Sequence, residues 1–129
     1  MLRAYRPARL AAGALALLAA HGAAGAGDAP VVHELAIADR AVVGEPVVRV
    51  TEGDRVELRW TTDEAAEIHL HGYDVVLGLV PGATATMAFD AHATGRFPVT
   101  AHGFGAHGEE DAGHGHDEAV LLYVEVHPR

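Results

Sequence analysis

The segment that decides the fold runs from residue 55 to residue 60 and is Arg55-Val56-Glu57-Leu58-Arg59-Trp60. Apolar and charged side chains alternate along its whole length. Because successive side chains of a β-strand point to opposite faces, this period of two predicts a strand with one buried face and one face in water. Trp60 is its largest apolar side chain, and we expect it to anchor the core.

Similar short runs follow one another along the rest of the chain. They are Val-rich or alternating, and turn signals such as Gly53-Asp54 and Pro81-Gly82 separate them. The expected strands are residues 31–37, 46–50, 55–60, 67–71, 73–79, 84–89, 95–101 and 119–126. Seven or eight short strands at this spacing predict an all-β fold, an antiparallel β-sandwich with Greek-key connections.

The N-terminal residues have the pattern of a secretory signal peptide. A start with three arginines precedes an apolar run over residues 10–20, and small residues follow that end in Ala24-Gly25-Ala26. The run of 11 residues is shorter than the roughly 20 needed to span a bilayer. We therefore predict a signal peptide over residues 1–26 and a single domain over residues 27–129, located in the periplasm or secreted. An uncleaved N-terminal anchor is the alternative.

The composition excludes several kinds of chemistry. The chain has ten histidines but no cysteine, serine, lysine, asparagine or glutamine. The absence of cysteine rules out disulfides and thiolate ligands, and the absence of serine and lysine rules out a serine triad and a Schiff-base lysine. Imidazole and carboxylate therefore remain as the main reactive groups.

The charge balance favours cations as ligands. Without residues 1–26, six arginines remain against 18 acidic side chains, and the formal net charge becomes −12. Such a surface repels nucleic acid and anionic lipid. We therefore expect no nucleic-acid partner and no membrane insertion after signal cleavage.

One pair of histidines lies on an expected strand. His69 and His71 alternate with the apolar Ile68 and Leu70, so both should point away from the core. Side chains at this spacing lie roughly 7 Å apart at the Cα, and two such imidazoles can share one metal ion. An ordinary pair of surface histidines is the alternative. His102 would join them if its strand is a neighbour.

A second group of histidines lies in a loop over residues 102–118. This stretch is rich in glycine and acidic residues, and histidine-rich tracts are typical of metal binding. A solvated acidic loop without function is the alternative. The candidate metal ligands of the whole chain are His69, His71, His102, His107, His114 and His116.

The order of these motifs resembles the cupredoxin-like domains of secreted bacterial proteins. The segments that carry the resemblance are residues 53–60 (GDRVELRW), 67–74 (EIHLHGYD), 81–82 (PG), 95–99 (GRFPV) and 121–126 (LLYVEV). In copper-carrying members a mid-chain histidine matches His69 or His71, and a cysteine comes from a strand near the C-terminus. Counting six residues on from Gly95 places Ala101 at that cysteine position. The resemblance therefore implies a cupredoxin-like fold without the thiolate of a blue-copper site.

Three interpretations of the function follow. The preferred one is a protein that holds or delivers copper through histidines at a non-blue site. Imidazole ligands also suit zinc and nickel, although the usual affinity order places Cu(II) highest. A periplasmic or membrane-bound protein would then be the delivery partner. The second interpretation is a metal-free scaffold that binds another protein. The third is a small mononuclear metalloenzyme; no residue is assigned a catalytic role, and enzymatic activity is left open.

Overall fold

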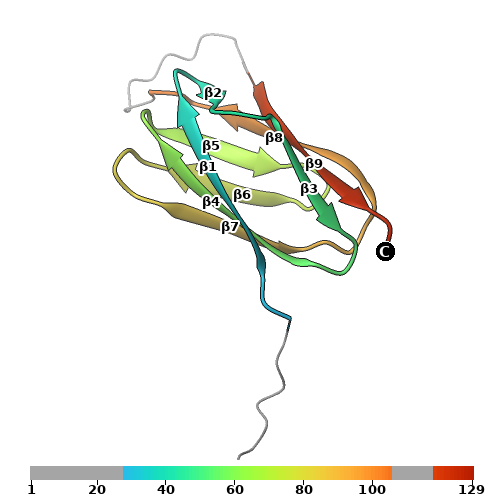
Figure 1. Cartoon of the computed structure of the whole chain (residues 1–129). Coiled ribbons are helices and arrows are strands. Elements are labelled where there is room, and N and C mark those ends of the chain that lie inside the picture. Colours follow the sequence, from blue (N-terminus) through green and yellow to red (C-terminus); the bar gives the residue numbers. More distant parts are fainter. Residues whose placement is uncertain (1–27, 106–117) are drawn as a thin grey trace, which may run out of the picture.

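The structure, a computed structural model, describes residues 28–105 and 118–129, and its regular elements in these ranges are β-strands (Figure 1). The strands are β1 (Val31–Ala38), β2 (Ala41–Val42), β3 (Val47–Thr51), β4 (Arg55–Thr62), β5 (Ala66–Leu70), β6 (Val75–Leu79), β7 (Ala85–Asp90), β8 (Gly95–His102) and β9 (Ala119–His127). Within these ranges no helix is long and apolar enough to cross a membrane. The expected signal peptide and three of the candidate ligands, His107, His114 and His116, lie outside the described residues.

The strands form two sheets that pack face to face (Figure 1). One sheet has the order β2-β1-β4-β7, and the other has the order β3-β9-β8-β5-β6. The predicted all-β sandwich is therefore confirmed, with nine strands in the described part of the chain. The sheets are mixed rather than purely antiparallel, because β1 runs parallel to β4 and β3 runs parallel to β9. Alternation along one strand defines its buried face but says nothing about the direction of its neighbour.

The core lies between the inner faces of the two sheets. Val56, Leu58 and Trp60 of β4 have no exposed surface, as the alternation predicts. Ile68 and Leu70 of β5 are equally buried and belong to the same apolar cluster. Burial of each large apolar side chain stabilises the fold by about 1.5–3 kcal/mol. Since a slip of one residue would exchange the two faces, this burial holds the intervening residue of β5 on the outer face.

The chain leaves β5 earlier than the sequence predicts. Residues 71–74 form a turn, although residues 67–71 and 73–79 were expected to be extended. Gly72 has φ +85° and Asp74 has φ +59°, both in the left-handed region. A Cβ on Gly72 would lie 2.4 Å from Cδ1 of Phe97, so this position accepts only glycine without a shift. His71 therefore lies in a turn and not on a strand.

Candidate metal centre

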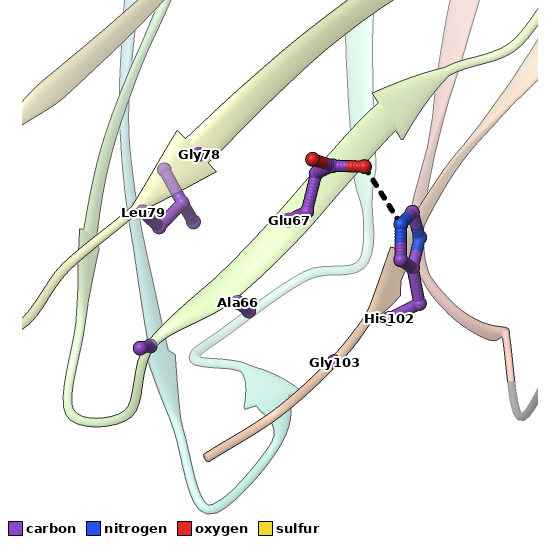
Figure 2. A pocket seen from close by; sticks show the side chains of 7 residues that line it. Ala66, Glu67, Gly78, Leu79, His102 and Gly103 are labelled. Carbon is purple, nitrogen blue, oxygen red and sulfur yellow. Dashed lines mark hydrogen bonds and ion pairs between the residues drawn. The ribbon is translucent and has the colours of Figure 1, made fainter. Parts of the chain in front are cut away.

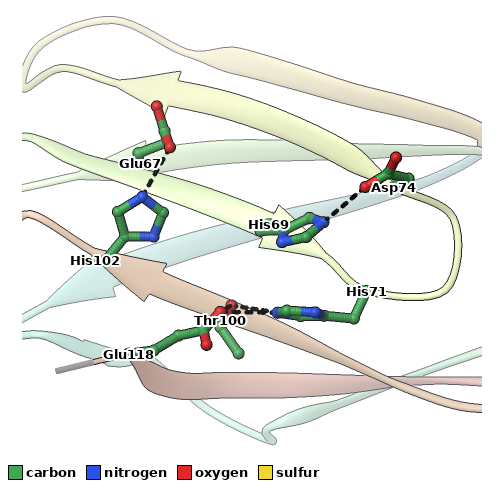
Figure 3. A network of polar contacts seen from close by, with 7 residues as sticks. All are labelled: Glu67, His69, His71, Asp74, Thr100, His102 and Glu118. Carbon is green, nitrogen blue, oxygen red and sulfur yellow. Dashed lines mark hydrogen bonds and ion pairs between the residues drawn. The ribbon is translucent and has the colours of Figure 1, made fainter. Parts of the chain in front are cut away.

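Three histidines with carboxylate partners lie close together on the outside of the sheet, namely His69 on β5, His71 in the turn after β5 and His102 on β8. His69 is paired directly with Thr100 in the sheet, and the next pair on this face is Glu67 with His102. Figure 3 shows a network of polar contacts on this face, formed by Glu67, His69, His71, Asp74, Thr100, His102 and Glu118.

The structure brings His69 and His71 together. Their ring centroids are 4.0 Å apart, with an angle of 39° between the ring planes. The backbone N–H of His71 donates a hydrogen bond to the carbonyl oxygen of Pro98 at 3.0 Å, which ties the turn to β8. The two imidazoles are therefore positioned by one strand and by the turn that follows it.

Glu118 completes this group from the start of β9. Its Oε1 lies 2.8 Å from Nε2 of His71, and the hydroxyl of Thr100 also donates a hydrogen bond to it. The hydrogen bonds from Thr100 and His71 hold the pKa of Glu118 below its ordinary value of 4.5. Because an ionised carboxylate only accepts hydrogen bonds, Nε2 of His71 carries the proton between the two groups.

One ligand atom from each of His69, His71 and Glu118 lies within 4.8 Å of the other two. Ligand atoms that bind one ion at about 2.0–2.2 Å lie about 3–4 Å from one another. Small side-chain rotations would therefore bring these three atoms to metal-binding distance. An ion bound there would replace the hydrogen bond between His71 and Glu118. Two imidazole nitrogens and one carboxylate oxygen suit Cu(II), Zn(II) or Ni(II), and they leave at least one coordination position for water or another group.

Asp74 is a further contact of this group. Its Oδ1 lies 3.3 Å from Nε2 of His69, which leaves Nδ1 of that ring to face an ion. A carboxylate on the second nitrogen is the usual way to orient a metal-binding imidazole. The side chain of Asp74 is 94% exposed, so this contact holds the ring only weakly.

The structure does not bring His102 into the group with His69 and His71. His102 lies on the outer face, as expected, but its Nε2 is 2.7 Å from Oε1 of Glu67. This pair borders a separate pocket (Figure 2). The register explains the separation, because Glu67 and not His69 is the direct cross-strand partner of His102.

The sequence did not single out Glu118 or Thr100. Glu118 is the last of several acidic residues before β9, and its spacing does not distinguish it from the others. Thr100 is buried beneath the group, although it lies on the outer face of β8. Ala101, at the position that the resemblance assigns to a cysteine, points into the core and has no exposed surface.

Comparisons with known proteins identify the fold. No known protein family and no curated protein matches the sequence. Among solved structures, the chain is similar to a chain of a heme-copper terminal oxidase dimer, with a TM-score of 0.55 and 21% identity over 74% of this chain. It is also similar to a copper binding protein in the apo form, with a TM-score of 0.52 and 9% identity over 74% of this chain. The blue copper oxidase from Nitrosomonas europaea gives a TM-score of 0.54 and 20% identity over 76% of this chain.

The matched regions cover different shares of these proteins. They make up 85% of the copper binding protein, 63% of the terminal oxidase chain and 39% of the blue copper oxidase. The chain thus spans less than two thirds of the two oxidase chains. At these identities the likeness concerns the fold, and the neighbours are cupredoxin-like. The chain therefore has a cupredoxin-like fold and lacks the cysteine of the blue-copper site.

Proposed function

We propose that this protein binds a copper ion through His69, His71 and Glu118, and that it holds or delivers the ion rather than transferring electrons. The observation that carries the proposal is the convergence of three ligand atoms within 4.8 Å on one sheet face. In addition, the buried Thr100 and the carboxylate of Glu118 both contact Nε2 of His71, which an ordinary pair of surface histidines would not require.

The donor atoms favour copper in its oxidised state. Imidazole and carboxylate ligands bind Cu(II) more tightly than the other common divalent ions, with zinc and nickel as the nearest competitors. The sequence contains no cysteine, so the intense thiolate charge transfer of a blue site cannot arise. Two of the similar structures are a copper binding protein and a blue copper oxidase, which supports copper as the ion.

The proposed role lies outside the cytoplasm. The signal pattern over residues 1–26 supports export to the periplasm or beyond. The negative charge of the remaining chain raises the local concentration of cations. His107, His114 and His116 would bind further copper ions weakly and raise their concentration near the site. A periplasmic or membrane-bound protein would receive the ion. The likeness to a chain of a heme-copper terminal oxidase is a further link to copper.

Metal-free protein loaded with Cu(II) tests the proposal. We expect one tightly bound ion per chain, with an EPR spectrum of the non-blue kind and hyperfine splitting from two imidazole nitrogens. Joint replacement by His69→Ala and His71→Ala should abolish this signal. His127→Ala is the matched control, because His127 is an exposed imidazole beside a carboxylate at the far end of β9. Equal affinity in the wild type and the double variant would overturn the proposal.

A further inference from the structure

A second histidine–carboxylate pair lies on the same face and has its own pocket. Nε2 of His102 is 2.7 Å from Oε1 of Glu67, and about half of each side chain is exposed. The pocket beside them has a volume of about 290 Å³, and Figure 2 shows Glu67 and His102 in contact among the residues that line it. Both side chains are therefore within reach of a dissolved ion.

The walls of this pocket consist mainly of very small residues. The lining residues besides the pair are Ala65, Ala66, Gly78, Leu79 and Gly103. Gly78 lies directly opposite Glu67 in the sheet, so a side chain there would project over the same face. A Cβ built on Gly78 would meet no atom within 4 Å. Glycine is thus not required here by crowding, and its effect is to leave the space beside Glu67 open.

We propose that Glu67 and His102 form a second divalent-cation site, separate from the group of His69, His71 and Glu118. Its ligands are one imidazole and one carboxylate, and water fills the remaining positions. Among the described residues no arginine lines the pocket, so none of them places a fixed positive charge against a cation there. An entering ion displaces only an exposed hydrogen bond between His102 and Glu67, which contributes little stability. The site uses none of the ligands of the first one, although the choice of copper as its ion rests on the proposed function.

The two sites are close neighbours. Thr100 is the direct partner of His69, and His102 lies two residues further along the same strand. Such diagonal neighbours in an antiparallel pair are about 7–8 Å apart. Ions bound at such neighbouring residues would interact magnetically, and an ion could move from the exposed, two-ligand site to the three-ligand site without leaving the sheet face. The second site should bind more weakly because the protein supplies fewer ligands.

The test is a Cu(II) titration of the full chain that carries His107→Ala, His114→Ala and His116→Ala, so that the loop histidines do not contribute. We expect two binding steps and, when both are filled, a half-field EPR signal from the coupled pair. In this background, His102→Ala should remove the weaker step. Gly78→Val should weaken that step at least tenfold by filling the pocket, while the tighter step stays unchanged. Far-UV circular dichroism and urea unfolding verify that each variant is folded.

The outcomes separate this site from the first one. A single binding step in the background protein, or a weaker step that survives His102→Ala, would overturn the second site and leave the first untouched. Loss of only the tighter step in the His69→Ala, His71→Ala variant would support both sites. If that variant kept all of its copper while His102→Ala lost it, the second site would stand and the proposed function would fail.

Discussion

Glu118 lies 47 residues after His71 in the chain, yet its Oε1 is 2.8 Å from Nε2 of that ring. The contact joins the turn after β5 to the first residue before β9, across the strand β8 that lies between them in the sheet. Thr100 of β8 supports it by donating its hydroxyl proton to the same carboxylate. A carboxylate held in this way is ionised and oriented before any ion arrives, and such preorganisation favours binding.

Replacement of this carboxylate should weaken copper binding without unfolding the protein. Glu118→Gln keeps the shape but removes the charge and one anionic ligand, so we expect an increase in Kd of about 10–100-fold or more. Glu64→Gln is the matched control, because Glu64 also has a lowered pKa but pairs with Arg40 away from the site. Isothermal titration with Cu(II) gives both values. An unchanged Kd for Glu118→Gln would exclude this residue as a ligand.

The same carboxylate should contribute to acid sensitivity in the metal-free state. The pKa of Glu118 is lowered in the folded protein, chiefly by the hydrogen bond from Thr100 and then by that from His71. A lowered folded pKa stabilises the protein above the ordinary value of 4.5, and this contribution is lost as the pH falls through the folded value. The stability difference between the wild type and Glu118→Gln should therefore be largest near pH 7 and should shrink below about pH 4. Urea unfolding at a series of pH values measures it, and a difference that grows on acidification would contradict the prediction.

Much of the fold follows from local patterns in the sequence. The alternation through Val56, Leu58 and Trp60 defines both a strand and its buried face, and the structure places all three in the core. The same logic places His69 on the outer face of β5. The direction of neighbouring strands does not follow from local patterns. The parallel pairing of β1 with β4 depends on how the chain crosses between the sheets.

The candidate site shows a similar division. The sequence predicts that His69 and His71 lie together, but their 4.0 Å ring separation depends on a turn and not on strand spacing. The sequence does not predict that Glu118 lies beside His71, because the position of Glu118 depends on the register of β8 against β9. That register is irregular at Val99 and Thr100, where a bulge shifts the partners from Leu122 to Val120. A bulge breaks the simple count of residues across a sheet.

The turn that carries His71 makes a strong prediction for Gly72. In Gly72→Ala the new methyl group would collide with Phe97 and would also require a left-handed backbone, so we expect a loss of about 2–4 kcal/mol in the free energy of unfolding. Copper affinity should fall as well, because the turn positions His71. Gly78→Ala is the control, since a Cβ there meets open space, and it should not destabilise the fold. Urea unfolding compares the two; equal stabilities would show that the turn relaxes freely.

Tyr73 should stabilise the same turn through its hydroxyl group. The hydroxyl donates to the carbonyl oxygen of Ala93 at 2.8 Å and accepts from the N–H of that residue at 3.2 Å. Tyr73→Phe keeps the ring but removes both hydrogen bonds, and we expect a loss of about 1–2 kcal/mol in the free energy of unfolding. Tyr123→Phe is the control, because the ring face of Tyr123 stays stacked against Arg96 when its hydroxyl is removed. Its stability should change by less than about 0.5 kcal/mol, and equal losses in the two variants would argue against the tie to Ala93.

Copper itself should stabilise the folded protein, and this effect should depend on pH. At a free Cu(II) concentration 100 times Kd, binding to the folded state alone adds about 2.7 kcal/mol to the free energy of unfolding. Protons compete with metal for imidazole nitrogen, so the gain should shrink as the pH is lowered from 7 to 5. Thermal unfolding with and without Cu(II) measures the gain in the wild type, in the His127→Ala control and in the joint His69→Ala, His71→Ala variant. The double variant should gain much less at either pH, because the tighter of the two sites that exist only in the folded chain is gone. A gain of the same size in all three proteins would place the stabilising copper elsewhere.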